Sequence, residues 1–300
     1  MGNDVIMATN QGVVKYNGSN LTTISPNTNG ALGMAISEDQ THIIYINSLG
    51  RTFLSQHGGN NFTDVSGTNS NNIPFSTMGR VEYAFSHEKV DGSYKVYASC
   101  SDNNLGGRIR GVWASNDGGQ NWTQIAPSYS EIDNPTTGFT PFSTSRSSQG
   151  NYDNIVTVDP DNPDRIILGG IDLYEWSNAT GVNPPAGEWN QASYWAAAPT
   201  SPVYVHADNH ELVWGFEDEL FIGNDGGIGR STNGGQTFVP SNRGYNVTQF
   251  YSVAFSAHGD VMGGTQDNGT LYNDHTMFTW QEFRELLGGD GFDCDISFRS

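Results

Sequence analysis

The sequence predicts an all-β fold made of many short strands joined by tight turns, and two observations favour this class. The first is composition: glycine accounts for 37 of 300 residues, 12% of the chain is aromatic, and only 15% is charged. Lysine occurs only at Lys15, Lys89 and Lys95, so the chain has few of the residues that fill exposed helix faces. The second is a repeated Gly-rich segment that is typical of hairpins.

Three segments align without gaps: Ser55 to Phe62, Ser115 to Trp122 and Ser231 to Phe238. Each has a serine, then Asp, Asn or His, two glycines and a final aromatic residue. The Asx-type side chain can bond to the backbone of the turn, glycine supplies a positive φ, and the aromatic ring fills the gap between sheets. Each segment lies between apolar stretches and therefore predicts a hairpin.

The apolar stretches around these hairpins divide into units of four short strands. The first unit offers only three, Val5 to Thr9, Gly12 to Tyr16 and Leu21 to Ile24. The later units are expected at Ala31 to Ser66, Arg80 to Ala126, Asn154 to Ser193, His206 to Pro240 and Phe250 to Phe283. Phe292 to Phe298 begins like an innermost strand, so we expect it to pair beside Val5 to Thr9 and to close the ring.

The repeated segment resembles the Asp-box, or BNR, repeat of β-propellers of the sialidase, sortilin and xyloglucanase types. Ser115 to Trp122 keeps both the Asp and the Trp of that repeat. Val158 to Pro163, Asn224 to Ile228 and Gly263 to Thr270 also resemble secreted bacterial propeller proteins. The resemblance implies one β-propeller domain over residues 1–300, with six four-stranded antiparallel blades, or an N-terminal fragment of a larger propeller. It also implies a secreted or cell-surface location.

Charge and hydropathy exclude several partners. The net charge of −19 repels phosphate backbones, so nucleic acid is not expected to bind. No apolar run reaches the roughly 18 to 20 residues that cross a bilayer, so membrane insertion is not expected. The two cysteines, Cys100 and Cys294, are too few for a disulfide framework.

Candidate catalytic residues are aspartates in Gly-rich segments between strands. Asp225, Asp267 and Asp290 are expected to converge on one mouth of the propeller. Carboxylates held close together can supply an acid and a base, because mutual repulsion raises one pKa while the other group stays ionised. The xyloglucanase resemblance implies Asp225 and Asp290 as the nearest matches to a catalytic Asp pair. The alternative for each Asp is a role in the turn alone.

Candidate substrate-binding residues come from neighbouring loops. They are Arg108, Arg110, Arg243, Tyr194, Trp195, His206, Asp208 and His210. The aromatic rings could stack on sugar faces. His206, Asp208 and His210 would share one face of a strand and could hold a metal ion. Acidic loops such as 159–164 and 290–295 could hold Ca²⁺, although no cofactor is required.

Together these features predict a propeller that engages carbohydrate, as a glycoside hydrolase using paired Asp residues. The alternative is a non-catalytic propeller of the sortilin type that binds a surface protein or serves as an adhesin.

Overall fold

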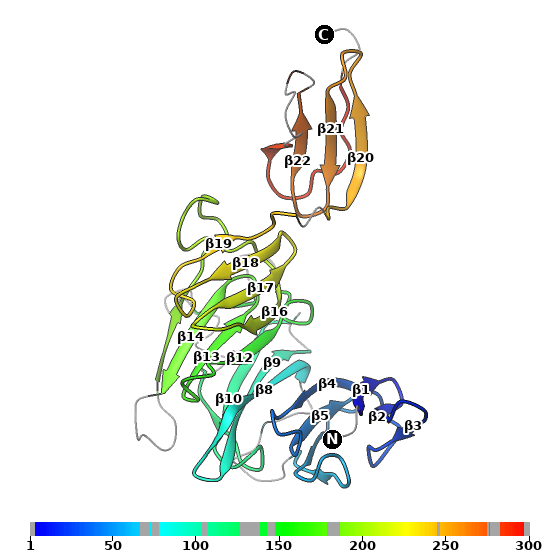
Figure 1. Cartoon of the computed structure of the whole chain (residues 1–300), viewed down its shortest axis with the longest axis vertical. Helices are drawn as coiled ribbons and strands as arrows, with labels where there is room; N and C mark the ends of the chain where they lie inside the picture. Colours follow the sequence, from blue (N-terminus) through cyan, green and yellow to red (C-terminus); the bar gives the residue numbers. More distant parts are fainter. Residues whose placement is uncertain are drawn as a thin grey trace.

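The computed structural model is all-β, as predicted. It describes residues 4–66, 73, 78–103, 107–126, 139–142, 148–178, 187–244, 247–274, 276 and 283–296. Within these ranges the strands form six antiparallel sheets that follow one another along the chain (Figure 1). No helix in the described ranges is long and apolar enough to cross a membrane.

The first sheet has three described strands, and each of the other five has four, arranged in chain order. The strands are β1 (Val5–Thr9), β2 (Gly12–Tyr16), β3 (Leu21–Thr23); β4 (Ala31–Ile36), β5 (Ile43–Asn47), β6 (Thr52–Ser55), β7 (Thr63–Asp64); β8 (Met78–Val90), β9 (Ser93–Asp102), β10 (Ile109–Ser115), β11 (Thr123–Gln124); β12 (Ile155–Val158), β13 (Arg165–Gly169), β14 (Leu173–Asn178), β15 (Gly187–Gln191); β16 (Asn209–Trp214), β17 (Leu220–Asn224), β18 (Gly227–Ser231), β19 (Val239–Pro240); β20 (Phe250–Phe255), β21 (Val261–Thr265), β22 (Thr270–Asn273) and β23 (Arg284–Leu287).

The sheets are arranged as blades of a β-propeller. The first strands of neighbouring sheets contact one another in turn: β1 with β4, β4 with β8, β8 with β12, and β12 with β16. Each sheet is a meander whose later strands lie farther from these contacts. Antiparallel meanders packed side by side through their first strands are the blades of this fold. The prediction of six blades is confirmed.

The hydrophobic core lies between the sheets. Four buried clusters join the first sheet to the second, the second to the third, the third to the fourth, and the fourth to the fifth. In β13, Ile166 and Leu168 belong to the cluster facing the third sheet, whereas Ile167 belongs to the one facing the fifth. Successive side chains of a strand point to opposite faces, so a blade between two others is apolar on both.

The three Gly-rich segments form equivalent outer turns, between the third and fourth strands of the second, third and fifth sheets. In each turn the serine hydroxyl accepts the N–H of the second glycine, at 2.9 Å for Ser55, 2.9 Å for Ser115 and 2.8 Å for Ser231. Both glycines have positive φ in all three turns, a conformation that favours glycine. The second glycine also faces an isoleucine of the preceding sheet, so the turns help to pack one blade on another.

The predicted closure of the ring is wrong for the described residues of the C-terminal segment. In Figure 1 the first sheet (β1 to β3) and the sixth (β20 to β22) lie at opposite ends of the molecule. Ser252 of β20 donates its hydroxyl to the carbonyl of Phe292 at 3.1 Å and accepts the N–H of Cys294 at 2.9 Å. The segment therefore lies on its own sheet, which closes a far shorter loop than pairing with β1 would. Residues 297 and 298 lie outside the described ranges.

Trp122 ends one of the three Gly-rich segments, and its packing can be tested directly. It is 3% exposed and belongs to the cluster between the second and third sheets. Trp122→Ala should lower the free energy of unfolding by about 3 to 5 kcal/mol, through lost burial and the cavity left behind. Urea unfolding followed by fluorescence measures the change.

Trp122→Phe is the matched variant. The indole N–H of Trp122 has no hydrogen-bond partner within the described residues, so removing it breaks no such bond. The phenylalanine variant should therefore lose less stability than the alanine variant. A loss below about 0.5 kcal/mol for Trp122→Ala would show that the ring does not fill the space between these blades.

Candidate functional site

Four aspartates stand where the second strand of a sheet leads into the third. Asp102 ends β9, Asp172 precedes β14, Asp225 follows β17 and Asp267 follows β21. Asp102 is buried beside Arg110, whose Nη1 lies 3.5 Å from its Oδ2. Asp172 accepts the N–H of Trp195 at 2.7 Å, and burial raises its pKa to about 6. These two therefore support the fold, whereas Asp225 and Asp267 lie beside a cavity.

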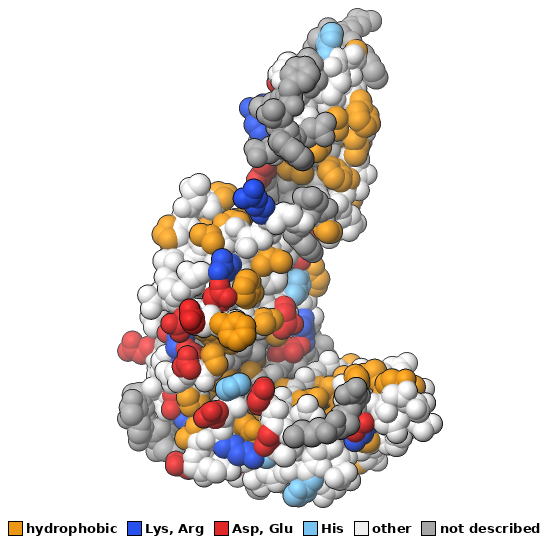
Figure 2. All heavy atoms as spheres, in the orientation of Figure 1, with side chains coloured by type: hydrophobic (Ala, Val, Ile, Leu, Met, Phe, Trp, Pro, Cys, Tyr) orange, Lys and Arg blue, Asp and Glu red, His pale blue; other side chains and the backbone are white. Residues whose placement is uncertain are grey.

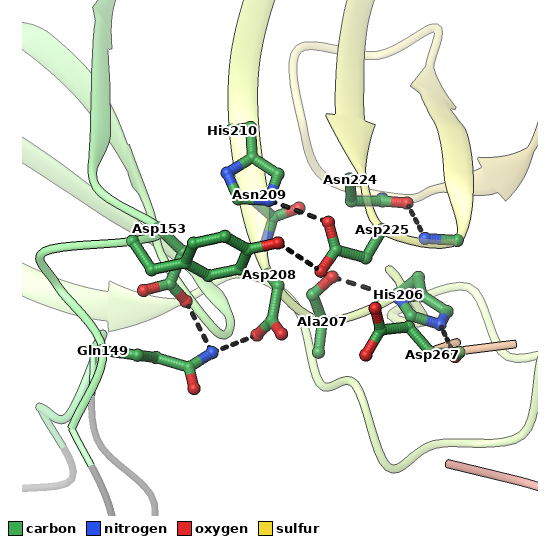
Figure 3. Close-up of polar contacts among 12 residues, drawn as sticks. Gln149, Asp153, His206, Ala207, Asp208, Asn209, His210, Asn224, Asp225 and Asp267 are labelled. Atoms are coloured by element: carbon green, nitrogen blue, oxygen red, sulfur yellow. Dashed lines mark hydrogen bonds and ion pairs between the residues drawn. The ribbon is translucent and has the colours of Figure 1, made fainter. Parts of the chain in front are cut away.

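Asp225 is held by two aromatic partners (Figure 3). His210 Nε2 lies 2.8 Å from Asp225 Oδ1, and the hydroxyl of Tyr152 donates to Asp225 Oδ2 at 3.1 Å. The rings of Tyr152 and His210 meet edge to face, with centroids 4.7 Å apart. Burial pushes the pKa of Asp225 up, but the hydrogen bonds from His210 and Tyr152 outweigh it and the pKa falls below its usual value. Asp225 is therefore ionised at neutral pH.

The hydrogen bond with Asp225 in turn raises the pKa of His210, because the pair is most stable when the imidazole is charged. Burial and the charge of Asp225 raise the pKa of Tyr152 to about 12, so its hydroxyl keeps its proton and donates. Of the three residues that the sequence pattern places on one strand face, only His210 lies in a strand, β16.

A second carboxyl pair lies next to this one. The side-chain amide of Gln149 donates to Asp153 Oδ2 at 3.1 Å and also bonds to Asp208 Oδ1 (Figure 3). Asp153 is fully buried, and its Oδ1 has no hydrogen-bond partner in the described part of the chain. Burial raises the pKa of Asp153 to about 8. Burial and the charges of Asp225 and Asp267 also raise the pKa of Asp208.

Asp267 connects the sixth sheet to this cluster. Its N–H donates to Asp290 Oδ1 at 3.0 Å, and its carbonyl accepts His206 Nε2 at 3.0 Å. The amide of Asn268 donates to the carbonyl of Asp225 at 3.0 Å. Burial, with the charges of Asp225 and Asp290, raises the pKa of Asp267. The structure thus brings Asp225, Asp267 and Asp290 together, while their catalytic role stays a prediction.

The ring-closure hypothesis requires Asp290 to begin a new innermost strand, but Asp290 does not. It forms a parallel bridge with Gly269, on the turn that carries Asp267.

A cavity of about 600 Å³ lies between the fifth and sixth sheets. Its wall combines carboxylates, amides and aromatic rings, among them Trp195, Tyr204, Asp208, Asn242, Asp267 and Glu285. Trp195 is 46% exposed, so much of its side chain is open to solvent. A concave site with apolar rings and a few polar groups is the usual form of a small-molecule site.

The predicted binding residues divide into two groups. Trp195, His206 and Asp208 line the cavity. His210 does not line it but pairs with Asp225, which lies beside it. Tyr194 is exposed beside Trp195, and Arg243 is exposed after β19, but neither lines the cavity. Arg108 and Arg110 flank the start of β10 in the third sheet, and Arg110 is engaged with Asp102.

His206, Asp208 and His210, which could hold a metal ion if they shared one strand face, do not share one. β16 begins at Asn209, so His206 and Asp208 precede it, and Asp208 has a φ of 64° that breaks the strand alternation. In the described ranges no group of three or more His, Cys, Asp or Glu side chains is placed to hold a metal ion. Asp159 and Asp164, from one of the two acidic loops, instead form ion pairs with Arg165 and Lys95.

Sequence reasoning missed Gln149, Tyr152, Asp153, Tyr204 and Glu285. Gln149 lies near the end of the long insertion 127–151, and Tyr152 and Asp153 follow it; residues 127–138 and 143–147 of the insertion lie outside the described residues. The length of that insertion was the available signal, because long insertions on a rigid scaffold often carry function.

Comparison with known proteins found solved structures only. No family model matches the chain, and no curated protein matches its sequence. YCF48 from Cyanidioschyzon merolae is 12% identical, with 87% of this chain and 72% of that one covered and a TM-score of 0.42. YCF48 bound to D1 peptide is 10% identical, with 94% and 79% covered and a TM-score of 0.44. The Cps50 (Swd1) β-propeller domain of Myceliophteria thermophila is 10% identical, with 96% and 84% covered and a TM-score of 0.45.

The raised pKa of Asp153 predicts a pH-dependent stability. From about pH 4 to pH 8 the folded chain holds a proton at Asp153 that the unfolded chain, with a pKa near 3.8, has released. The contribution of Asp153 to the free energy of unfolding should therefore fall as the pH rises, by up to about 1.4 kcal/mol per pH unit. Urea unfolding of the native chain and of Asp153→Asn, from pH 5 to pH 8, should show a shallower fall for the variant.

Asp161→Asn is the control, because Asp161 is an exposed turn residue in the fourth sheet. It should keep the pH dependence of the native chain. Parallel stability curves for the native chain and Asp153→Asn would show that Asp153 is ionised in the folded protein at neutral pH.

Proposed function

We propose that the chain is a carbohydrate-engaging propeller and that it hydrolyses glycosidic bonds at the cavity between its fifth and sixth sheets. The observation that carries the proposal is a pair of neighbouring aspartates with opposite pKa displacements beside an aromatic-walled cavity. Asp267 has a raised pKa and lines the cavity, whereas Asp225 has a lowered pKa. Carboxyl groups whose environments separate their pKa values are suited to acid and base roles.

Asp267 is the proposed general acid. Its carboxyl group would donate a proton to the glycosidic oxygen as the bond to the leaving sugar breaks. Asp290 supports this role, because its charge helps to raise the pKa of Asp267 and its Oδ1 accepts the Asp267 backbone N–H.

Asp225 is the proposed anionic partner. It is ionised, its side chain is 15% exposed, and His210 and Tyr152 hold its orientation. Its chain neighbours Asn224 and Gly226 line the cavity. An oriented carboxylate there could activate a water molecule or stabilise positive charge on the sugar.

The cavity wall also suits sugars. The exposed ring of Trp195 can cover an apolar sugar face, and the side chains of Asn224, Asn242 and Asn268 can bond to hydroxyl groups.

A protein-binding function is the second candidate, and an exposed apolar face on the sixth sheet favours it. Tyr251, Val253 and Phe255 alternate along β20 and are 47%, 48% and 59% exposed. Phe292 stacks on Tyr251, with ring centroids 5.4 Å apart. Figure 2 shows hydrophobic side chains gathered along this sheet. Exposed apolar patches of this kind mark interaction sites.

Asp225→Asn tests the hydrolytic role. The substitution preserves shape but removes the anion, so glycan hydrolysis should fall by about 10² to 10⁴-fold while glycan binding persists. A reducing-sugar assay against a panel of polysaccharides measures hydrolysis, and a glycan array measures binding. Asp161→Asn should leave both unchanged, and an unaltered hydrolysis rate in Asp225→Asn would remove Asp225 from the mechanism.

Trp195→Ala tests the binding wall. Loss of the ring should weaken binding of any glycan found on the array by about tenfold, with unfolding stability little changed because the side chain is half exposed. Tyr194→Ala is the matched control, since Tyr194 is equally exposed but does not line the cavity. Equal weakening by both variants would place the sugar elsewhere.

The two candidate functions separate in one comparison. The protein-binding function is correct if the chain binds no glycan but binds a purified protein. Tyr251→Asp or Phe255→Asp should then abolish that binding, while Asp225→Asn should keep it.

A further inference from the structure

The cavity between the fifth and sixth sheets is acidic. Asp208, Asp267 and Glu285 line it, and its described lining contains no lysine or arginine. A fourth carboxyl group, that of Asp290, accepts the N–H of Asp267 beside it. Carboxylates gathered in a partly buried site repel one another unless a positive charge joins them.

Neutral amide groups, rather than basic side chains, hold part of this cluster. Asp208 is bonded by the Gln149 amide, which also holds Asp153 (Figure 3). Asp153 is fully buried in the same network, and its Oδ1 is left without a hydrogen-bond partner among the described residues. Burial keeps Asp153 protonated up to about pH 8, so the negative charge of this network falls on Asp208, where burial and the charges of Asp225 and Asp267 outweigh the nearby His206 and His210 and raise the pKa.

Aromatic rings stand beside these carboxylates. Trp195 and Tyr204 line the same cavity as Glu285. Burial raises the pKa of Tyr204, and the nearby charge of Glu285 raises it further, which places the two side chains close together. An aromatic face next to a carboxylate attracts an organic cation by both its quadrupole and its neighbour's charge.

We infer that the cavity selects sugars that carry a protonated amino group, with Asp208 and Glu285 facing the ammonium and Trp195 facing the ring. The inference rests on the proposed carbohydrate function and names its ligand class. An organic ammonium fits better than a metal ion, because the described His, Cys, Asp and Glu side chains form no group placed to coordinate a metal.

Three tetrasaccharides with the same β-1,4 backbone test the selection. They differ only at carbon 2: glucosamine tetramer carries an ammonium, its N-acetylated form carries an amide, and cellotetraose carries a hydroxyl. Isothermal titration calorimetry at pH 5.5 and low salt should give the glucosamine tetramer a Kd at least about tenfold lower than the other two. The advantage should shrink at 0.5 M salt, because salt screens the attraction.

Two variants assign the preference to the cavity. Glu285→Gln and Asp208→Asn should each reduce the advantage of the glucosamine tetramer, while Asp161→Asn should keep it. Glu285 is an exposed residue of β23, and asparagine tolerates the positive φ of residue 208, so both variants keep the local fold.

The outcomes separate this inference from the proposed function. A glucosamine tetramer that does not bind, or binds no better than cellotetraose, overturns the inference, and the glycan array then decides the carbohydrate function by itself. A preference that survives both cavity variants also overturns it. Tight binding of an oligolysine peptide, with no glycan bound on the array or in the titrations, overturns both.

Discussion

The face-to-face packing of successive sheets is the constraint on which the rest of the structure depends. The second, third and fourth sheets each contribute to two buried clusters, as β13 shows for the fourth, and this forces each of them to lie between two neighbours. Contact between the first strands, from β1 to β16, then brings the turns after the second strands of these sheets to one end. Asp225 of the fifth sheet meets the turn that carries Asp267 through a loop contact, in which the Asn268 amide donates to the Asp225 carbonyl. The candidate site therefore depends on contacts between turns of the fifth and sixth sheets, which no local motif specifies.

The sequence was sufficient for the blades but not for the ends of the chain. Ser115 and Gly119 specify a turn through one local hydrogen bond, so their repetition identified equivalent hairpins. The sheet on which Phe292 packs depends on contacts that no local sequence pattern predicts. Gly264 lets the Phe292 carbonyl approach so closely that an added Cβ would clash with the carbonyl oxygen. Likewise, Asp225 could be proposed from its turn, but its partner Tyr152 lies 73 residues away, and the length of the insertion before Tyr152 was the available signal for it.

The distribution of the few basic residues gives the site its electrostatic character. Thirteen lysines and arginines accompany 32 acidic residues, and several of them are already engaged with acidic partners. Arg165 bonds to both Asp159 and Glu175, and Lys95 pairs with Asp164. The two histidines near the cavity, His206 and His210, are the basic groups closest to the acidic cluster among the described residues that line or support it. Negative potential is consequently concentrated where the sheets meet.

The position of the cavity has a mechanical consequence. Its walls come from two blades and from the segment between the fourth and fifth sheets: Asn242 belongs to the fifth blade, Glu285 and Gly289 to the sixth, and Trp195 to that segment. A molecule that touches both walls binds only while the blades keep this separation, so its binding free energy also stabilises their relative angle. By reciprocity, a second ligand that binds only this arrangement of the two blades and the molecule in the cavity strengthen each other's binding by the same factor.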